Sequence, residues 1–257
     1  FKSSPKIEYK TKNDDDLATI IYTSGTTGNP KGVLITHGNF LKNINAHFEY
    51  YQFKNFEDEV SLAFLPLTHV FERSWSLLCL YGGARVYFLE DSKAIAKALV
   101  EVKPTMMCVV PRFLQKVYAG VLEKSEESSS LKKKIFNWAI KIGKQTAEFK
   151  RVGLEPPFNL KSKEFFADLL VFSKIKEKLG GRLWFIPCGG AAISTEVTQF
   201  FESVNIHITV GYGLTETTAT LTALPLKNFI HGSCGKTLPG VEIKIGENEE
   251  ILAKGNG

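Results

Sequence analysis

Short apolar runs alternate with stretches of helical periodicity over the first 110 residues of the chain. In the helical stretches apolar residues recur at three- and four-residue spacing, as on one buried helix face. This pattern predicts helices over 37–51, 67–81 and 93–102, the first capped by Thr36 and the third by Ser92. The apolar runs contain the β-branched and aromatic residues typical of strands, and they lie at 18–22, 33–35, 61–65, 84–89 and 106–110.

The pattern changes to helices alone between residues 112 and 178. The second of three expected helices, 131–149, has an apolar face and lysines elsewhere on its surface. Such a helix packs on its own protein in the plainer interpretation, although it could also lie on an anionic membrane. A Pro156-Pro157 break separates it from a third helix, which is expected from about 165 to 179.

Strands return at 183–187 and 206–210, with a helix capped by Ser194 between them. After residue 225 the sequence turns to loops and strands, including a hairpin that turns at 246–249. Strands that alternate with helices predict an α/β fold with a mainly parallel sheet flanked by helices on both faces. We therefore expect a helical excursion over 112–178 and a β-rich subdomain that starts within 226–257.

The richest polar stretch follows the first strand and reads Tyr22-Thr23-Ser24-Gly25-Thr26-Thr27-Gly28-Asn29-Pro30-Lys31-Gly32. Its glycines can bring backbone N–H groups to a ligand, its hydroxyls can donate to phosphate oxygens, and its lysine adds positive charge. It is not the G-x-x-x-x-G-K-[ST] loop, because Pro30 precedes Lys31 and Gly32 follows it. A solvated turn has similar composition, but we expect a phosphate-binding loop.

Two further glycine-rich loops, 189–192 and 211–218, follow two later strands. Ligands of parallel sheets bind beyond the carboxyl ends of the strands, where such loops gather. Glycines at Gly189, Gly190, Gly211 and Gly213 would let a flat base lie close to the backbone, and Tyr212 could stack on it. Each loop alone could be an ordinary turn, but the three together predict a nucleotide site.

Composition narrows the class of protein without identifying it. The apolar fraction of 44% and charged fraction of 23% are ordinary for a globular protein, and no apolar run approaches the ~20 residues that span a bilayer. The net charge of +5 comes from residues 120–178, which carry no nucleic-acid-binding motif. The four cysteines and five histidines show no metal-ligand spacing, so we expect buried free thiols and a cytoplasmic location.

The polar stretch Y-T-S-G-T-T-G-N-P-K-G resembles the phosphate loop of the acyl-adenylate-forming enzymes: acyl-CoA synthetases, luciferases and peptide-synthetase adenylation domains. G-Y-G-L-T-E-T at 211–217 is similar to the family's adenine and magnesium motif. By this resemblance Tyr212 faces the adenine, Thr215 contacts the α-phosphate and Glu216 coordinates Mg²⁺. It also implies that ATP is bound by Thr23, Ser24, Gly25, Thr26, Thr27, Gly28, Lys31, Gly189, Gly190, Ala191, Gly211 and Gly213.

P-L-T-H-V-F-E-R at 66–73 resembles the loop that leads to the acyl pocket of long-chain acyl-CoA synthetases. His69 would then border the carboxylate-binding end of that pocket. V-P-R at 110–112, the lysine-rich helix and G-K-x-x-P-G-x-E at 235–242 are also similar to this group, so the resemblance begins near Asp16 and covers nearly the whole chain.

The resemblance implies a long-chain fatty acid–CoA ligase that uses ATP and Mg²⁺, with CoA as co-substrate and Lys31, His69, Thr215 and Glu216 as catalytic residues. It also implies that 1–257 is part of an AMP-binding N-terminal domain. The family's ribose-binding aspartate, hinge and C-terminal lid domain would follow Gly257, so we expect the isolated chain to be weak or inactive. Activation of another carboxylic acid, or nucleotide binding without catalysis, are the alternatives. Acyl chain length and oligomeric state are not predicted.

Overall fold

A parallel sheet forms the centre of the protein in a computed structural model that describes residues 12–23 and 29–255. Strand β3 (Val60–Ala63) pairs in parallel with β4 (Arg85–Phe88), and β5 (Phe185–Cys188) pairs in parallel with β6 (His207–Tyr212). The extended segment around Met106 joins the two pairs, because Met106 bridges in parallel to Ser61 and to Phe185. The predicted strand at 106–110 is therefore present as isolated bridges, and the predicted parallel sheet is confirmed.

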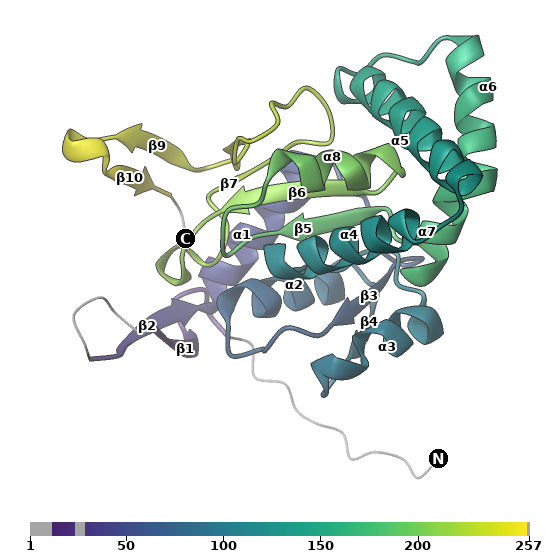
Figure 1. The fold of residues 1–257 in the computed structure, drawn as a ribbon. Helices are drawn as coiled ribbons and strands as arrows, with labels where there is room; N and C mark the ends of the chain where they lie inside the picture. Colours follow the sequence, from purple (N-terminus) through teal and green to yellow (C-terminus); the bar gives the residue numbers. More distant parts are fainter. Residues whose placement is uncertain (1–11, 24–28, 256–257) are drawn as a thin grey trace.

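Alternate residues of this sheet enter two different cores. Met107, Val109 and Ile186 pack in a core with α3 (Ile95–Val102), α4 (Pro111–Glu126) and α8 (Thr195–Ser203). Their neighbours, Met106, Cys108 and Phe185, pack on the opposite side with α1 (His37–Tyr51) and α2 (Val70–Tyr81). Helices thus cover both faces of the sheet, as the apolar strand sequences predict (Figure 1).

The first two strands form a separate antiparallel hairpin of β1 (Leu17–Thr23) and β2 (Lys31–Thr36). Ile21 and Ile35 are buried, whereas Ile20 and Tyr22 are exposed. The β-branched residues of the apolar run at 18–22 suit a buried strand, but only one face of this strand is buried, because side chains of the hairpin alternate between a covered and an open face. Two short strands, β7 (Thr222–Ala223) and β8 (Lys236–Thr237), extend the central sheet in antiparallel fashion beyond β6.

Helices alone occupy the segment after α4, as predicted. They are α5 (Ser130–Arg151), α6 (Phe158–Ala167), the π-helical turn η2 (Asp168–Phe172) and α7 (Ser173–Lys178). The third predicted helix thus begins at residue 158, earlier than expected. The apolar face of α5 is covered, since Ala139, Ile142 and Gly143 are buried and α5 contacts α4, α6 and α8.

Side-chain caps account for the start of α1 and of the turn before α3. Thr36 caps α1 through a capping box, in which its hydroxyl accepts from the Asn39 N–H at 3.2 Å. Asp91, rather than Ser92, caps the turn η1 (Ser92–Ala94) before α3, so that prediction is wrong by one residue. Ser194 takes the N-cap position of α8, but its side chain makes no capping hydrogen bond.

The remaining predictions concern the C-terminal strands, the cysteines and the membrane. Strands β9 (Glu242–Ile245) and β10 (Ile251–Lys254) form the expected hairpin, with the turn η4 (Glu247–Glu249) between them.

Three cysteines are buried, but Cys234 is exposed because it lies in a surface loop, which corrects the expectation for that residue. Across the described residues, every helix is too short or too polar to cross a membrane.

Candidate functional site

A pocket of about 990 Å³ opens at the carboxyl ends of β3, β5 and β6. It is bounded by the β1–β2 hairpin on one side and by α1 and α2 on another. Ala191 is exposed and is not among the lining residues, so it lies outside the pocket wall. The other described residues that the sequence predicts for the site all line this pocket: Thr23, Lys31, His69, Gly189, Gly190, Gly211, Tyr212, Gly213, Thr215 and Glu216.

The β1–β2 hairpin brings both ends of the predicted phosphate loop to the pocket. Thr23 pairs with Lys31 across the hairpin, and the Thr23 hydroxyl lies 3.5 Å from the Lys31 carbonyl oxygen. Ser24, Gly25, Thr26, Thr27 and Gly28 lie outside the described residues, so their contacts stay a prediction.

The loop after β6 folds back tightly on itself. A Cβ at Gly213 would lie 1.7 Å from the carbonyl oxygen of Ala219, so only glycine fits this backbone approach. The Leu214 N–H donates to the Thr217 hydroxyl at 2.9 Å and closes the turn η3 (Thr215–Thr217). This turn fixes the backbone of Thr215 and Glu216 at the pocket wall.

The loop after β5 is held against the neighbouring strand segment and α2. The Gly189 N–H donates to the Val109 carbonyl oxygen at 3.3 Å, and Gly190 follows at φ +85°, in the left-handed region that favours glycine. The ring of Phe71 from α2 lies 3.5 Å from the position that a Gly189 Cβ would take. The loop after β5 therefore presents backbone to the pocket, because its lining residues Gly189 and Gly190 have no side chains.

One face of α1 forms a further wall that the sequence analysis did not assign. Asn43, His47 and Tyr51 are spaced by four residues and all line the pocket. The Tyr51 hydroxyl lies 2.7 Å from the Thr209 hydroxyl, and the Asn43 side-chain amide donates to the Thr220 carbonyl oxygen at 3.3 Å. Burial lowers the pKa of His47. The four-residue spacing of these polar side chains was the available signal.

The inner end of the pocket is apolar. Phe53, Trp75, Leu78 and Phe185 line it, and they belong to the core between α1, α2 and the sheet. The indole N–H of Trp75 donates to the Ser61 hydroxyl at 2.9 Å, which fixes the ring in place. A pocket that is polar at one end and apolar at the other fits a ligand with a charged head and an apolar chain.

Glu72 is fully buried beneath the segment that carries His69. Its carboxylate accepts from the Leu65 N–H at 3.1 Å and from the Ser76 hydroxyl at 3.2 Å. Burial raises its pKa, although these hydrogen bonds act in the opposite direction. Glu72 thus ties the chain after β3 to the first turn of α2, at whose N-terminus the exposed His69 lies.

Mg²⁺ fits the donor set at Glu216. Residues 12–23 and 29–255 contain no cluster of three carboxylate, histidine or cysteine side chains that could enclose a metal. Mg²⁺ usually binds through one or two carboxylates, with phosphate oxygens and waters as its other ligands. The exposed Glu216 carboxylate at the pocket wall is therefore a sufficient protein ligand for Mg²⁺ that arrives with a nucleotide.

Comparison with known protein families identifies the enzyme family of this chain. The family model described as AMP-binding enzyme matches residues 2–257. The chain belongs to the AMP-binding enzyme family. It is 35% identical over 252 residues to the peroxisomal long chain acyl-CoA synthetase 6 of Arabidopsis thaliana, covering 97% of this chain and 34% of that protein. It is 32% identical over 240 residues to the long-chain-fatty-acid–CoA ligase FadD15 of Mycobacterium bovis, covering 93% and 40%.

Solved structures of AMP-binding enzymes share the fold. The O-succinylbenzoate coenzyme A synthetase of Bacillus subtilis in complex with ATP and magnesium ion is similar with a TM-score of 0.64 and 21% identity, over 99% of this chain and 45% of that one. The N-terminal domain of FACL13 from Mycobacterium tuberculosis matches with the same TM-score at 18% identity, over 99% and 54%. The chain thus spans about a third to two fifths of the curated relatives described above and about half of these structures.

Proposed function

We propose that this chain supplies the nucleotide-binding and acyl-binding half of a long-chain fatty acid–CoA ligase, as part of its N-terminal domain. The observation that carries the proposal is one pocket in which both ends of the predicted phosphate loop and two glycine-rich loops meet an apolar inner end. The named relatives, which are long-chain acyl-CoA synthetases and ligases, support the assignment.

In the proposed reaction a fatty carboxylate oxygen attacks the α-phosphorus of ATP. The bond between the α-phosphorus and the oxygen that bridges to the β-phosphate breaks. Pyrophosphate leaves with the electron pair of that bond, and acyl-AMP forms. The thiol sulfur of CoA, as the thiolate, then attacks the acyl carbon, and AMP departs with the electron pair of the broken C–O bond. Neither step needs an oxidant or reductant. Phosphate substitution asks the protein mainly for positioning and for stabilisation of developing charge.

The pocket residues have distinct roles in this proposal. Lys31 and the Thr23 hydroxyl, at the two ends of the phosphate loop, hold the β- and γ-phosphates. Tyr212 packs on the adenine, and the Thr215 hydroxyl orients the α-phosphate. Glu216 would hold Mg²⁺, which neutralises phosphate charge when bound.

The acyl chain occupies the inner end of the pocket. Trp75, Phe185 and Leu78 would surround its methylene groups and exclude water, which contributes about 0.8 kcal/mol for each buried methylene. Glu72 holds the backbone that carries His69, so His69 would remain at the junction between the acyl chain and the nucleotide. An acid without a long apolar chain would leave this inner end unfilled.

The proposal is tested by the variant Glu216→Ala in the complete protein that carries this chain. Pyrophosphate release from Mg-ATP is measured with palmitate, acetate and an amino-acid mixture. We expect release with palmitate from the parent protein and none from the variant, which should keep its circular dichroism spectrum. Glu247→Ala, at an exposed turn between β9 and β10, is the matched control and should retain full activity.

The same assay separates the alternatives. Unchanged pyrophosphate release by Glu216→Ala would contradict the magnesium role. Release with amino acids but not with palmitate would assign another acid as substrate. ATP binding without release for any acid would reduce the function to nucleotide binding. The cytoplasmic location remains a prediction that this assay does not address.

A further inference from the structure

Four aromatic side chains meet at the inner end of the pocket. We call them the aromatic floor: Tyr51, Phe53, Trp75 and Phe185. Phe185 lies at the centre of this group, because its ring centroid is 5.3 Å from that of Tyr51, 5.8 Å from that of Phe53 and 6.2 Å from that of Trp75. Tyr51 and Phe53 also contact each other, with centroids 5.1 Å apart. At these distances the rings pack directly on one another.

The aromatic floor lies well below the glycine-rich loops at the mouth of the pocket. Gly189, Pro187 and Phe185 line the pocket in succession along β5 and the loop that follows it. At the rise of an extended strand, the distance from Gly189 to Phe185 is about 13 Å. On α1 the lining residues run from Asn43 to Tyr51, and the helix rise between them is about 12 Å. The two depths agree, so the floor ends a slot that runs along the sheet.

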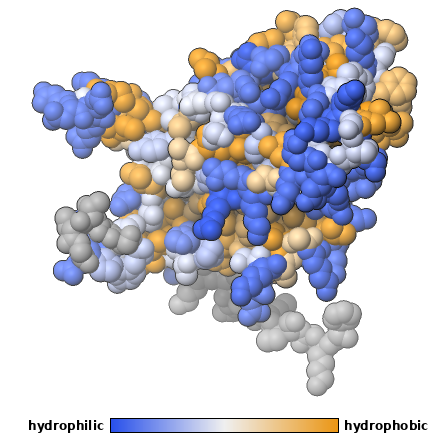
Figure 2. Space-filling view, viewed as in Figure 1, coloured by the Kyte–Doolittle hydropathy of each residue, from blue (hydrophilic) through white to orange (hydrophobic). Residues whose placement is uncertain are grey.

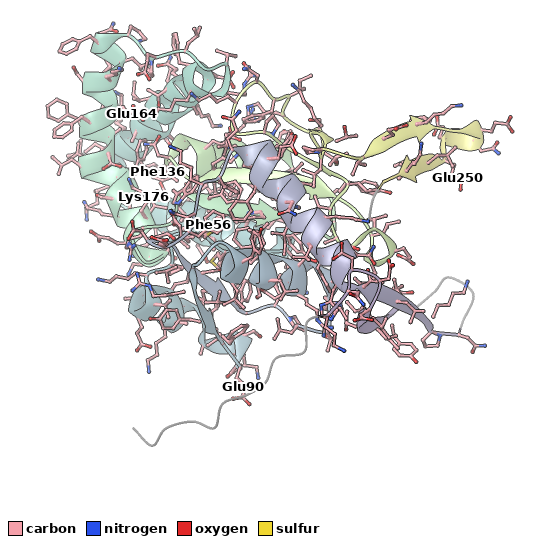
Figure 3. The ribbon with its side chains drawn as sticks, turned by 180° about the vertical axis from the view of Figure 1, so that it is seen from behind. Phe56, Glu90, Phe136, Glu164, Lys176 and Glu250 are labelled. Atoms are coloured by element: carbon pink, nitrogen blue, oxygen red, sulfur yellow. The ribbon has the colours of Figure 1, made fainter. Side chains whose placement is uncertain are left out.

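The aromatic floor lies in the interior of the protein, whereas hydrophilic side chains cover much of the face that Figure 2 shows. Phe185 is 1% exposed, and His207, which lies outside the pocket wall, stacks on its ring with centroids 6.0 Å apart. Phe56, labelled in Figure 3, packs on Phe53 with centroids 4.9 Å apart and is also buried. Close-packed side chains of this kind give way to a ligand only by rearranging. A ligand chain that reaches Phe185 therefore ends there.

We propose that the aromatic floor sets the upper limit of acyl chain length, and that Phe185 is the side chain which an acyl chain of limiting length meets. This inference rests on the proposed ligase function, which places the acyl chain at the inner end of the pocket. Up to the limit, each methylene that is buried strengthens binding about fourfold. Beyond the limit, further methylenes gain no burial unless they displace packed rings, and such overpacking is unfavourable.

Phe185 is the member of the aromatic floor whose replacement changes the pocket most cleanly. The Tyr51 hydroxyl binds the Thr209 hydroxyl at 2.7 Å, and the Trp75 indole N–H donates to the Ser61 hydroxyl at 2.9 Å. Truncation of either ring would therefore leave a buried polar group without its partner. The apolar side chain of Phe185 makes no hydrogen bond, and Phe185→Leu removes only the outer part of its ring. The space that this opens is apolar and takes about two further methylenes of an acyl chain.

The test is the chain-length dependence of pyrophosphate release by the complete protein that carries this chain. Values of kcat/KM for saturated acids from laurate to behenate locate the length above which the parent loses activity. For the acid two carbons beyond that length, Phe185→Leu should raise kcat/KM about fifteenfold over the parent, because two more methylenes are buried. Phe201→Leu is the matched control, since Phe201 is equally buried but belongs to the core on the other side of the sheet. It should lower the melting temperature to a similar extent and leave the chain-length limit unchanged.

A second variant makes the opposite change and decides the question if Phe185→Leu does not fold. Leu78→Phe enlarges a side chain that lines the same end of the pocket, so the limit should move to shorter acids. A limit that neither variant moves would overturn the proposal, as would a parent that shows no limit up to behenate. The same shift in Phe201→Leu would also overturn it, because a general loosening of the protein would then explain the change. A parent that releases pyrophosphate with no acid would instead contradict the proposed function and, with it, this inference.

Discussion

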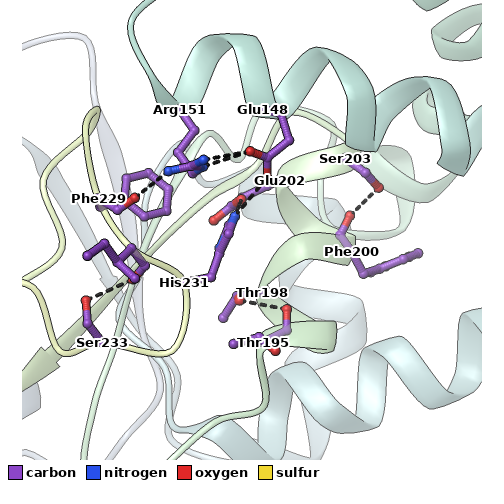
Figure 4. Close-up of polar contacts among 11 residues, drawn as sticks. Glu148, Arg151, Thr195, Thr198, Phe200, Glu202, Ser203, Phe229, His231 and Ser233 are labelled. Atoms are coloured by element: carbon purple, nitrogen blue, oxygen red, sulfur yellow. Dashed lines mark hydrogen bonds and ion pairs between the residues drawn. The ribbon is translucent and has the colours of Figure 1, made fainter.

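Glu202 on α8 is the acidic group whose environment gives the clearest prediction. One of its carboxylate oxygens, Oε1, is buried and has no hydrogen-bond partner among the described residues, and Oε2 lies 3.7 Å from the His231 ring nitrogen Nε2 (Figure 4). Burial raises the pKa of Glu202 to about 8, the charge of Glu148 acts in the same direction, and Arg151 opposes both. Arg151 in turn donates to Glu148 and lowers the pKa of that carboxyl. Glu202 is therefore protonated in the folded protein at pH 7.

A raised pKa in the folded state makes stability fall as pH rises. The unfolded chain releases the Glu202 proton near pH 4.5, whereas the folded protein keeps it until about pH 8. The associated stability is fully present below pH 4.5 and is lost as pH rises through 8. At 1.36 kcal/mol for each pKa unit, the loss between pH 5 and pH 8.5 is about 4 kcal/mol.

The variant Glu202→Gln keeps the shape of the side chain and removes the titration. Urea unfolding of both proteins is measured at intervals from pH 5 to pH 8.5, and the difference between them isolates Glu202 from other titrating groups. We expect the variant to gain about 4 kcal/mol relative to the parent over this range. Glu127→Gln, at an exposed position after α4, is the control and should show no such trend. A parent-to-variant difference that stays constant within about 1 kcal/mol would refute the reasoning.

Two further predictions follow from the same structure. Burial lowers the pKa of His207 to about 4, so the folded protein excludes a proton that the unfolded chain binds below pH 6.5; stability is therefore lost as pH falls from 6.5 to 4, by about 3 kcal/mol. His207→Phe should abolish that slope in urea unfolding, and an unchanged slope would show that another group causes it. Gly213→Ala should weaken ATP binding at least tenfold in calorimetry, because its Cβ would meet the Ala219 carbonyl oxygen. Gly120→Ala is the control, because a Cβ at this helix position would meet no atom of the described residues within 4 Å; it should leave ATP binding unchanged and add about 1 kcal/mol of stability. Equal ATP affinity in both variants would contradict the role of the tight loop.

The sequence predicts the elements of this fold well because most are decided locally. The four-residue periodicity and Thr36 cap predict α1 with its observed bounds, and the apolar run at 206–210 becomes the main part of β6. The errors arise where one residue or one partner decides the outcome. Asp91 accepts a hydrogen bond that Ser92 was expected to accept, and Ile20 is exposed because the hairpin has one covered face.

Some residues of the candidate site could be predicted from the sequence, and others depend on tertiary packing. Lys31 and Gly213 could be chosen from sequence because they lie in glycine-rich polar stretches that follow strands, whereas Glu216 was chosen because G-Y-G-L-T-E-T resembles the magnesium motif of the family. Tyr51 and Phe185 were not assigned: the four-residue spacing of Asn43, His47 and Tyr51 was a signal, but tertiary packing determines which face of α1 and which residues of β5 line the pocket.

The most direct test of the account is calorimetric titration of this chain with a non-hydrolysable palmitoyl-adenylate analogue, compared with the acetyl analogue. Such a molecule fills the nucleotide loops and the apolar inner end of the pocket together, and it needs no turnover. The account predicts that the palmitoyl analogue binds at least a hundredfold more tightly than the acetyl analogue, and that Gly213→Ala weakens both. Equal affinity for the two analogues would contradict the acyl assignment, and no binding of either would contradict the site itself.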